Sequence, residues 1–239
     1  MTCKYTAIIV EPRKHKALHF VLNNMSECLS NEWKIILFHG INNETYSTEI
    51  VNKLNEIYNN KIELIKLDII NLNQKTYSEL LANRLDIYNY INTEYFLIFQ
   101  TDSMMFKKNC NLLDLFLNKG YDYIGSPWLI CNYPPTRDRD FIGNGGFSLR
   151  KKETMVKIIQ NNKWDENNEW HEDLFFTKKY AGINTIKPSY DEAKMFCVDE
   201  IFSPLTMACH RPWCHSHYSE LAKIYPECEI LKSLQEEEM

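Results

Sequence analysis

Glycine, arginine and long apolar runs are all scarce in this sequence of 239 residues. It contains seven glycines, its Lys and Arg number 27 against 32 Asp and Glu, and no apolar run reaches the length of a membrane span. The net charge of −5 and the lack of a basic block differ from the charge pattern that neutralises a phosphate backbone, so nucleic acid is not an expected partner. The apolar stretch Ala7–Val10 is too short for the core of a signal peptide. We therefore expect a cytoplasmic protein without a membrane span.

The eight cysteines lie scattered along the chain and lack the paired spacing of a disulfide framework. We expect reduced thiols, as in most cytosolic proteins. A chain with 44% hydrophobic and 25% charged residues has the composition of an ordinary globular protein. At this length it buries enough surface to form a core without disulfides or a structural metal. A single domain over residues 1–239 is therefore expected.

Apolar strands alternate with amphipathic helices through the first hundred residues. The expected strands are Ala7–Val10, Trp33–His39, Ile62–Leu67 and Tyr95–Gln100, and the expected helices are Lys14–Leu29, Ser47–Tyr58 and Tyr77–Tyr90. This alternation predicts an α/β fold with a mostly parallel sheet covered on both faces. The second half is rich in loops, with expected elements at Asn111–Asn118, Tyr121–Ile124, Met155–Ile159, Asp173–Tyr180 and Glu220–Met239. Lys178, Lys179 and Gly182 are typical of a helix C-terminus after Asp173–Tyr180.

The most apolar strand is followed by the polar residues Gln100, Thr101, Asp102 and Ser103. Ligands of open α/β sheets bind outside the carboxyl ends of strands. Oxygen donors at that edge suit Mg²⁺ or Mn²⁺ bound together with a phosphate. Asp102 is therefore a candidate metal ligand, and an acid that only caps the next segment is the alternative.

Three of the seven glycines fall within Gly143–Gly146. Adjacent glycines let the backbone approach a bound group closely, which predicts a floor for a sugar. A hairpin turn between Arg139–Ile142 and Phe147–Arg150 is a second explanation, compatible with the first.

Glu172 and Asp173 stand directly before the apolar residues of a predicted helix. Carboxylates at that place stabilise the helix dipole. A carboxylate can also accept the proton of an acceptor hydroxyl, which makes Asp173 a candidate general base. Burial beside Trp170 and Phe175 is expected to raise its pKa.

The segment Cys209–His217 holds three of the seven histidines and two cysteines. Its spacing departs from the paired patterns of closed zinc sites. A single imidazole could instead complete a site held mainly by Asp102 and phosphates. Ordinary polar surface residues are the remaining interpretation.

The motifs QTDS, YDYIGSPW, GNGGFSLR, HEDLFF and HRPW follow one another in an order that resembles nucleotide-sugar glycosyltransferases of the GT-A fold. The resemblance runs from about Ile8 to Trp213. The chain is similar in particular to a family of GT-A-like domains with QTDS, YDYIGxPW and GNGGxSLR motifs, and distantly to the β1,3-galactosyltransferase and fringe group. This implies a single GT-A (Rossmann-like) α/β domain, in which residues 1–103 bind the nucleotide sugar, 104–217 form the loop-rich acceptor and catalytic half, and 218–239 form a C-terminal helix and acidic tail.

The resemblance also implies an activity and its groups. The expected reaction moves a sugar from a UDP-linked donor to a hydroxyl of a glycan or protein, with inversion, with Mn²⁺ or Mg²⁺ as cofactor and with Asp173 as base. The residues implied in donor binding are Val10, Glu11, Arg13, Tyr77, Arg84, Gln100, Thr101 and Asp102. The implied metal ligands are Asp102 and His210, with His215 and His217 less favoured, and the implied sugar and acceptor contacts are Trp128, Asn144, Gly145, Gly146 and Glu172.

One departure from the GT-A pattern keeps other functions open. The DxD motif of such enzymes reads Gln100-Thr101-Asp102 here, so its first carboxylate is missing. A non-catalytic carbohydrate-binding or scaffold protein on a degenerate fold is therefore an alternative. A nucleotidyltransferase with Asp102 and Asp173 as metal ligands is another, although no basic, glycine-rich loop follows the first strand. Trp128 could equally pack in the core or offer an apolar face to a sugar.

Overall fold

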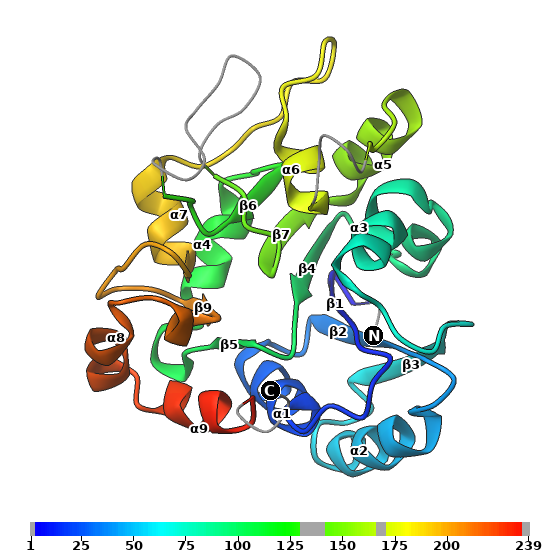
Figure 1. Cartoon of the computed structure of the whole chain (residues 1–239), viewed down its shortest axis with the longest axis vertical. Coiled ribbons are helices and arrows are strands. Elements are labelled where there is room, and N and C mark those ends of the chain that lie inside the picture. Colours follow the sequence, from blue (N-terminus) through cyan, green and yellow to red (C-terminus); the bar gives the residue numbers. More distant parts are fainter. Residues whose placement is uncertain (1–2, 130–141, 166–170, 236–239) are drawn as a thin grey trace.

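A six-stranded sheet runs through the computed structural model, which describes residues 3–129, 142–165 and 171–235 (Figure 1). The strands, in the order β3-β2-β1-β4-β7-β6, are Ile62–Lys66, Trp33–His39, Tyr5–Val10, Tyr95–Phe99, Phe147–Lys151 and Tyr123–Gly125. The first four strands of this order run parallel, and β7 is antiparallel to both β4 and β6. The predicted α/β fold with a mostly parallel sheet is confirmed.

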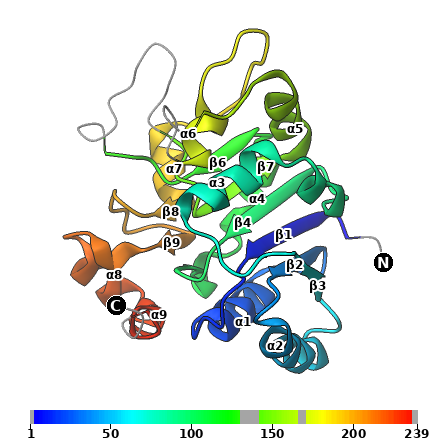
Figure 2. The same cartoon turned by 45° about the vertical axis from the view of Figure 1, so that its right-hand side comes forward.

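Helices cover both faces of this sheet (Figure 2). Side chains of α1, Leu18–Cys28, α2, Glu44–Ile57, and α4, Leu112–Asn118, pack on one face. Those of α3, Gln74–Asn83, α5, Lys152–Asn161, and α6, Glu172–Thr177, pack on the other. The remaining helices are α7, Tyr190–Phe196, α8, Tyr218–Ile224, and α9, Glu227–Ser233, with short 3₁₀ turns at Asp86–Tyr90 (η1), Lys107–Asn109 (η2) and Pro212–Cys214 (η3).

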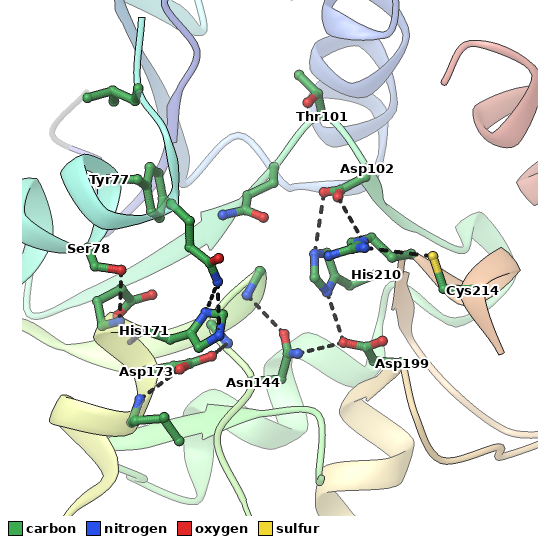
Figure 3. Close-up of a pocket in the computed structure, with 18 of the residues that line it drawn as sticks. Tyr77, Ser78, Thr101, Asp102, Asn144, His171, Asp173, Asp199, His210 and Cys214 are labelled. Atoms are coloured by element: carbon green, nitrogen blue, oxygen red, sulfur yellow. Dashed lines mark hydrogen bonds and ion pairs between the residues drawn. The ribbon is translucent and has the colours of Figure 1, made fainter. Parts of the chain in front are cut away.

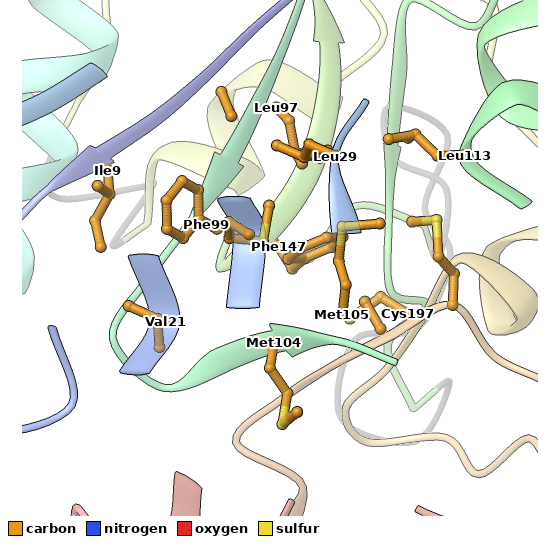
Figure 4. Packing of buried hydrophobic residues seen from close by; sticks show 14 of the residues in the cluster. Ile9, Val21, Leu29, Leu97, Phe99, Met104, Met105, Leu113, Phe147 and Cys197 are labelled. Atoms are coloured by element: carbon orange, nitrogen blue, oxygen red, sulfur yellow. The ribbon is translucent and has the colours of Figure 1, made fainter. Parts of the chain in front are cut away.

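The strands are apolar runs because both of their faces are buried. In β4, Leu97 and Phe99 join the core on the side of α1, while Phe96 and Ile98 join the core on the side of α3. Figure 4 shows the first of these cores, in which Leu97 and Phe99 lie near Phe147 of β7. Alternate side chains of a strand point to opposite faces, so a continuous apolar run is what a doubly covered sheet requires.

A small second sheet was not predicted. It has the order β5-β9-β8, with β5 at Ser103–Met105, β9 at Ala208–His210 and β8 at Cys197–Val198. β5 continues directly from the turn after β4, so the Gln100–Asp102 segment connects the two sheets. The middle strand β9 pairs antiparallel with β5 and parallel with β8.

Two predicted helices are interrupted. Tyr77–Tyr90 is α3, which ends at Asn83, followed by an extended Arg84 and then η1. Glu220–Met239 is two helices, α8 and α9, with Pro226 between them as the residue before α9. Proline lacks a backbone N–H and disfavours helix in the residue before it, which explains the second break. Residues 236–239 lie outside the described residues.

Two turn predictions need correction. The helix expected over Asp173–Tyr180 ends at Thr177, and Gly182, with φ of 75°, lies in the turn that links Tyr180 to Ile183 instead of capping the helix. The hairpin expected before β7 is absent at its described end, because Ile142 pairs with Pro127 while β7 pairs with β4 and β6. Residues 130–141 are outside the described part.

Among helices of the described ranges, none has both the length and the apolar character needed to cross a membrane. The seven cysteines in those ranges are free thiols.

Candidate functional site

A cavity of about 590 Å³ opens at the carboxyl ends of β1 and β4. Its walls come from the segments after β1, β4, β8 and β9, from the glycines before β7, and from the start of α6. This edge of an open α/β sheet is where ligands are expected to bind. Thirteen of the fifteen predicted site residues line the cavity: Glu11, Arg13, Tyr77, Gln100, Thr101, Asp102, Trp128, Asn144, Gly145, Gly146, Glu172, Asp173 and His210.

Val10 and Arg84 are not among the lining residues. Val10 packs against the core on the side of α3, since it is the last residue of a doubly covered strand. Arg84 follows the end of α3 and forms an ion pair with Asp86, with a distance of 2.5 Å between Nη2 and Oδ2. Neither residue is in place to contact a molecule in this cavity.

Asp102 and His210 face each other because of the small sheet. Ser103 of β5 pairs with His210 of β9, and the N–H of Arg211 donates to the carbonyl oxygen of Asp102 at 3.0 Å. Asp102 Oδ1 and His210 Nε2 then lie 3.4 Å apart. Both atoms are buried, and apart from this ion pair neither has a hydrogen-bond partner.

A divalent cation fits this pair of atoms. A carboxylate oxygen and an imidazole nitrogen are both suitable ligands for Mn²⁺, and each lacks another partner. Among the described residues no group of three or more His, Cys, Asp or Glu side chains could hold a metal ion. A cation between Asp102 and His210 would therefore need further ligands from a bound molecule.

Two neighbouring carboxylates change the pKa of His210. Burial alone would lower its pKa, but the negative charges of Asp102 and Asp199 outweigh burial and raise the pKa of His210 to about 10. Burial would likewise raise the pKa of Asp102, yet the charge of His210 holds that pKa below its usual value. A metal at Nε2 would displace the proton from that nitrogen, since metal ligands bind deprotonated.

Asp173 is the second residue of α6, and backbone groups fix its carboxylate. The N–H of Gly145 donates to Oδ2 at 2.9 Å, and the N–H of Leu174 donates to Oδ1 at 2.7 Å. Burial and the negative charge of Glu172 raise the pKa of Asp173 to about 7. Burial, the predicted cause of this shift, is its largest cause, and the charge of Glu172 adds a contribution that was not predicted. Trp170 lies outside the described residues. A carboxylate with a pKa near 7 is suited to accept a proton at neutral pH.

Glu172 anchors α6 to the sheet. Its two carboxylate oxygens accept hydrogen bonds from Nη1 and Nη2 of Arg150, at 2.7 and 2.8 Å. Arg150 is fully buried, and its guanidinium lies over the ring of Tyr123 at 4.8 Å. Because both oxygens of Glu172 are occupied by Arg150, its place in the structure is that of an anchor beside Asp173 rather than a free contact for a sugar.

The glycines before β7 pack against side chains of the protein itself. A Cβ on Gly146 would lie 2.2 Å from Nε2 of His210, and one on Gly145 would lie 2.4 Å from Oε1 of Glu172. Gly143 has φ of 143° and packs against Thr177. The backbone of these glycines therefore comes close to the imidazole of His210 and to Glu172. Its approach to a bound sugar stays a prediction.

The residues after β1 form another wall of the cavity. Arg13 binds Glu11 through Nε and Nη2, each at 2.9 Å from a carboxylate oxygen. The hydroxyl of Thr101 donates to the same carboxylate at 3.4 Å. Trp128 is 4% exposed and lines the cavity, so it is both packed and in position to contact a ligand.

Asp199 was missed by the sequence analysis. It follows β8, lines the cavity and accepts hydrogen bonds from Nδ1 of His210 at 3.0 Å, Nε2 of His215 at 2.9 Å and Nδ2 of Asn144 at 2.5 Å. Figure 3 shows Asp102, His210 and Asp199 in a row, with Asn144 beside Asp199. The signal that could have found it is an acid directly after a short apolar run, the same pattern that singled out Asp102.

Most of the chain matches a protein family. A family model described as "Protein of unknown function (DUF5672)" matches residues 61–210, which include Asp102, Asp173, Asp199 and His210. No curated protein matches the chain.

Solved structures are similar to this chain at low sequence identity. The chain is similar to TarS 1–349 from S. aureus in complex with UDP-GlcNAc, at 11% identity and a TM-score of 0.52, over 95% of this chain and 66% of that one. It is also similar to the mannosyltransferase PcManGT from Pyrobaculum calidifontis in complex with GDP-Man and Mn²⁺, at 10% identity and a TM-score of 0.46, over 66% of this chain. It spans about half of that protein, 47% of its length. The likeness to TarS concerns the fold alone.

Proposed function

We propose that this chain, which belongs to the family described as "Protein of unknown function (DUF5672)", is a glycosyltransferase that moves a sugar from a nucleotide-sugar donor to a hydroxyl acceptor. Its fold is similar to that of TarS, which was solved with UDP-GlcNAc. That likeness supports a nucleotide-sugar donor, and we infer a UDP-linked one. The acceptor would be a hydroxyl of a glycan or a protein.

The donor would lie across the carboxyl ends of β1 and β4. Glu11 and Arg13 line the cavity and would offer a paired carboxylate and guanidinium to the nucleoside. Gln100 and Thr101 follow β4 and lead to Asp102. Asp102 and His210 would hold a divalent cation, which when bound supplies positive charge to the leaving diphosphate.

Asp173 would act as the general base. As the acceptor oxygen forms its bond to the anomeric carbon, its proton passes to the carboxylate of Asp173, and the bond to the nucleoside diphosphate breaks on the opposite face. Attack opposite the leaving group gives an inverted anomeric carbon. The N–H groups of Gly145 and Leu174 hold the carboxylate in one orientation during this transfer.

One observation carries the proposal. The cavity that holds the buried pair of Asp102 Oδ1 and His210 Nε2, which have no other partner, is also lined by Asp173, a carboxylate with a pKa of about 7. A cation site and a base of suitable pKa in one cavity are the two groups that an inverting sugar transfer needs.

The test is a panel of nucleotide sugars incubated with the protein and Mn²⁺, with release of nucleoside diphosphate as readout. We expect slow hydrolysis of at least one UDP-sugar without any acceptor. Asp173→Asn is nearly isosteric and should bind the same donor with unchanged Kd while kcat falls by roughly 10²- to 10⁴-fold. The matched control is Asp191→Asn, because Asp191 also stands in the first turn of a helix but its side chain is 85% exposed.

Two results would contradict parts of the proposal. Full activity of Asp173→Asn, or a product with retained anomeric configuration, would remove Asp173 from this role and the inverting mechanism with it. Tight binding of a nucleotide sugar without turnover would favour the non-catalytic alternative.

A further inference from the structure

His210 is the last residue of β9, the middle strand of the small sheet, and has a carboxylate on each side. In β9 it pairs with Ser103 of β5, next to Asp102. On the other side, Val198 of β8 pairs with Cys209, which brings the following residue, Asp199, alongside His210. The two carboxylates therefore reach opposite nitrogens of one imidazole: Asp199 Oδ2 lies 3.0 Å from Nδ1 and Asp102 Oδ1 lies 3.4 Å from Nε2.

The contacts of Asp199 determine the orientation of the ring. A carboxylate can only accept hydrogen bonds, so Nδ1 of His210 must be the donor to Asp199. When a cation binds at Nε2 and displaces any proton there, the ring keeps the single proton on Nδ1 that it donates to Asp199, and the lone pair is on Nε2. Nε2 is the nitrogen that faces Asp102 and that has no hydrogen-bond partner.

Asp199 is itself held in place. Its side chain is 7% exposed, and besides His210 it accepts hydrogen bonds from Nε2 of His215 and Nδ2 of Asn144. Asn144 in turn accepts a hydrogen bond from the N–H of Gly146, whose backbone packs against the imidazole. The ring of His210 is thus fixed at its Nδ1 edge by Asp199 and at one face by the glycine segment.

We propose that Asp199 is a positioning residue for the cation site: it fixes the tautomer and orientation of His210 so that Nε2 is presented as a ligand beside Asp102. The proposal rests on the proposed function, because it concerns the cation of that reaction. When a histidine binds a metal through one nitrogen, removing the residue that hydrogen-bonds its other nitrogen commonly lowers metal affinity by about 10- to 100-fold. Asp199 acts through His210 and does not touch the cation.

The experiment measures the affinity of the full chain for Mn²⁺, with and without UDP, by titration followed by electron paramagnetic resonance. We expect Asp199→Ala to weaken Mn²⁺ binding by about 10- to 100-fold. Asp199→Asn should recover most of that loss, because its amide oxygen can still accept from Nδ1 of His210 while its amide nitrogen donates to His215. Asp191→Ala, at an exposed carboxylate, is the matched control.

A double-mutant cycle separates positioning from a general structural role. In a His210→Ala background, Asp199→Ala should cause no further loss of Mn²⁺ affinity, since the residue through which Asp199 acts is already gone. An equal loss in both backgrounds would overturn the proposal, and so would a wild-type affinity in Asp199→Ala.

A second readout does not depend on whether Asp199→Ala folds. In ¹⁵N spectra of the wild-type protein with Mg²⁺, His210 should carry its proton on Nδ1, and Asp199→Asn should keep this pattern. A proton on Nε2 in the presence of Mg²⁺ would overturn the assignment.

Failure of the proposed function is seen separately, as absence of nucleotide-sugar binding and hydrolysis. A wild-type protein that binds UDP but no Mn²⁺ overturns this inference and leaves a metal-free transferase.

Discussion

Replacing Asp173 with asparagine should stabilise the protein at pH 8, even though it removes the proposed base. The pKa of Asp173 is raised from its usual value of 3.8 to about 7, by burial first and then by the charge of Glu172. Between those two pH values the folded state holds a proton that the unfolded state has released. The free energy of unfolding therefore falls as pH rises through this interval and levels off above pH 7.

The size of the effect follows from the shift. About three pKa units correspond to about 4 kcal/mol, and this is an upper bound because the carboxylate borders the cavity and is partly screened by solvent. We expect Asp173→Asn to be more stable than wild type by about 1 to 3 kcal/mol at pH 8. Near pH 4 the two proteins should be equally stable, because protonated Asp173 and asparagine then have the same charge.

The assay is urea unfolding at pH 4, 6 and 8 for the wild type, Asp173→Asn and the control Asp191→Asn. The gain should grow with pH in Asp173→Asn and stay within about 0.5 kcal/mol in the control, as for most surface substitutions. A stability difference between Asp173→Asn and wild type that is independent of pH, or a loss of stability at pH 8, would refute the raised pKa of Asp173. It would also remove the pKa argument for Asp173 as a base.

Two further substitutions test the supports of the site. Gly146→Ala should push the ring of His210 away, because its Cβ would lie 2.2 Å from Nε2, and we expect weaker Mn²⁺ binding in titration with little change in UDP binding measured without metal; unchanged Mn²⁺ affinity would contradict the observed packing. Glu172→Gln should lower the free energy of unfolding by about 3 to 5 kcal/mol in urea, because it leaves the buried charge of Arg150 without its partner, and a loss below about 1 kcal/mol would show that Arg150 finds another.

The central strands could be predicted because each is an apolar run between polar residues. Trp33–His39 has the predicted bounds, and the other parallel strands agree within two residues. The strands of the small sheet have three residues or fewer, so no periodicity could reveal them. Their existence depends on pairing between segments far apart in the chain.

The candidate site could be predicted only where a local pattern marks it. Asp102 follows a strand and Asp173 stands in the first turn of a helix, and both positions can be recognised from neighbouring residues. Asp199 could have been recognised as an acid after a short apolar run, but its place beside His210 depends on the register of β8 on β9, which no local pattern contains. Arg150 lies within a strand, and its pairing with Glu172 depends on how α6 docks on β7.

The pairing of β5 with β9 also affects the order in which the parts of the chain fold. Synthesis starts at the N-terminus, so β1 to β4 and Asp102 emerge well before His210 exists to meet it. Closing so long a loop costs more chain entropy than forming the neighbouring parallel strands, so this pairing is expected among the late steps of folding. A ligand that binds only when Asp102 and His210 are together stabilises the fully folded chain by its binding free energy. It does not stabilise folding intermediates in which the second half of the chain has not yet packed.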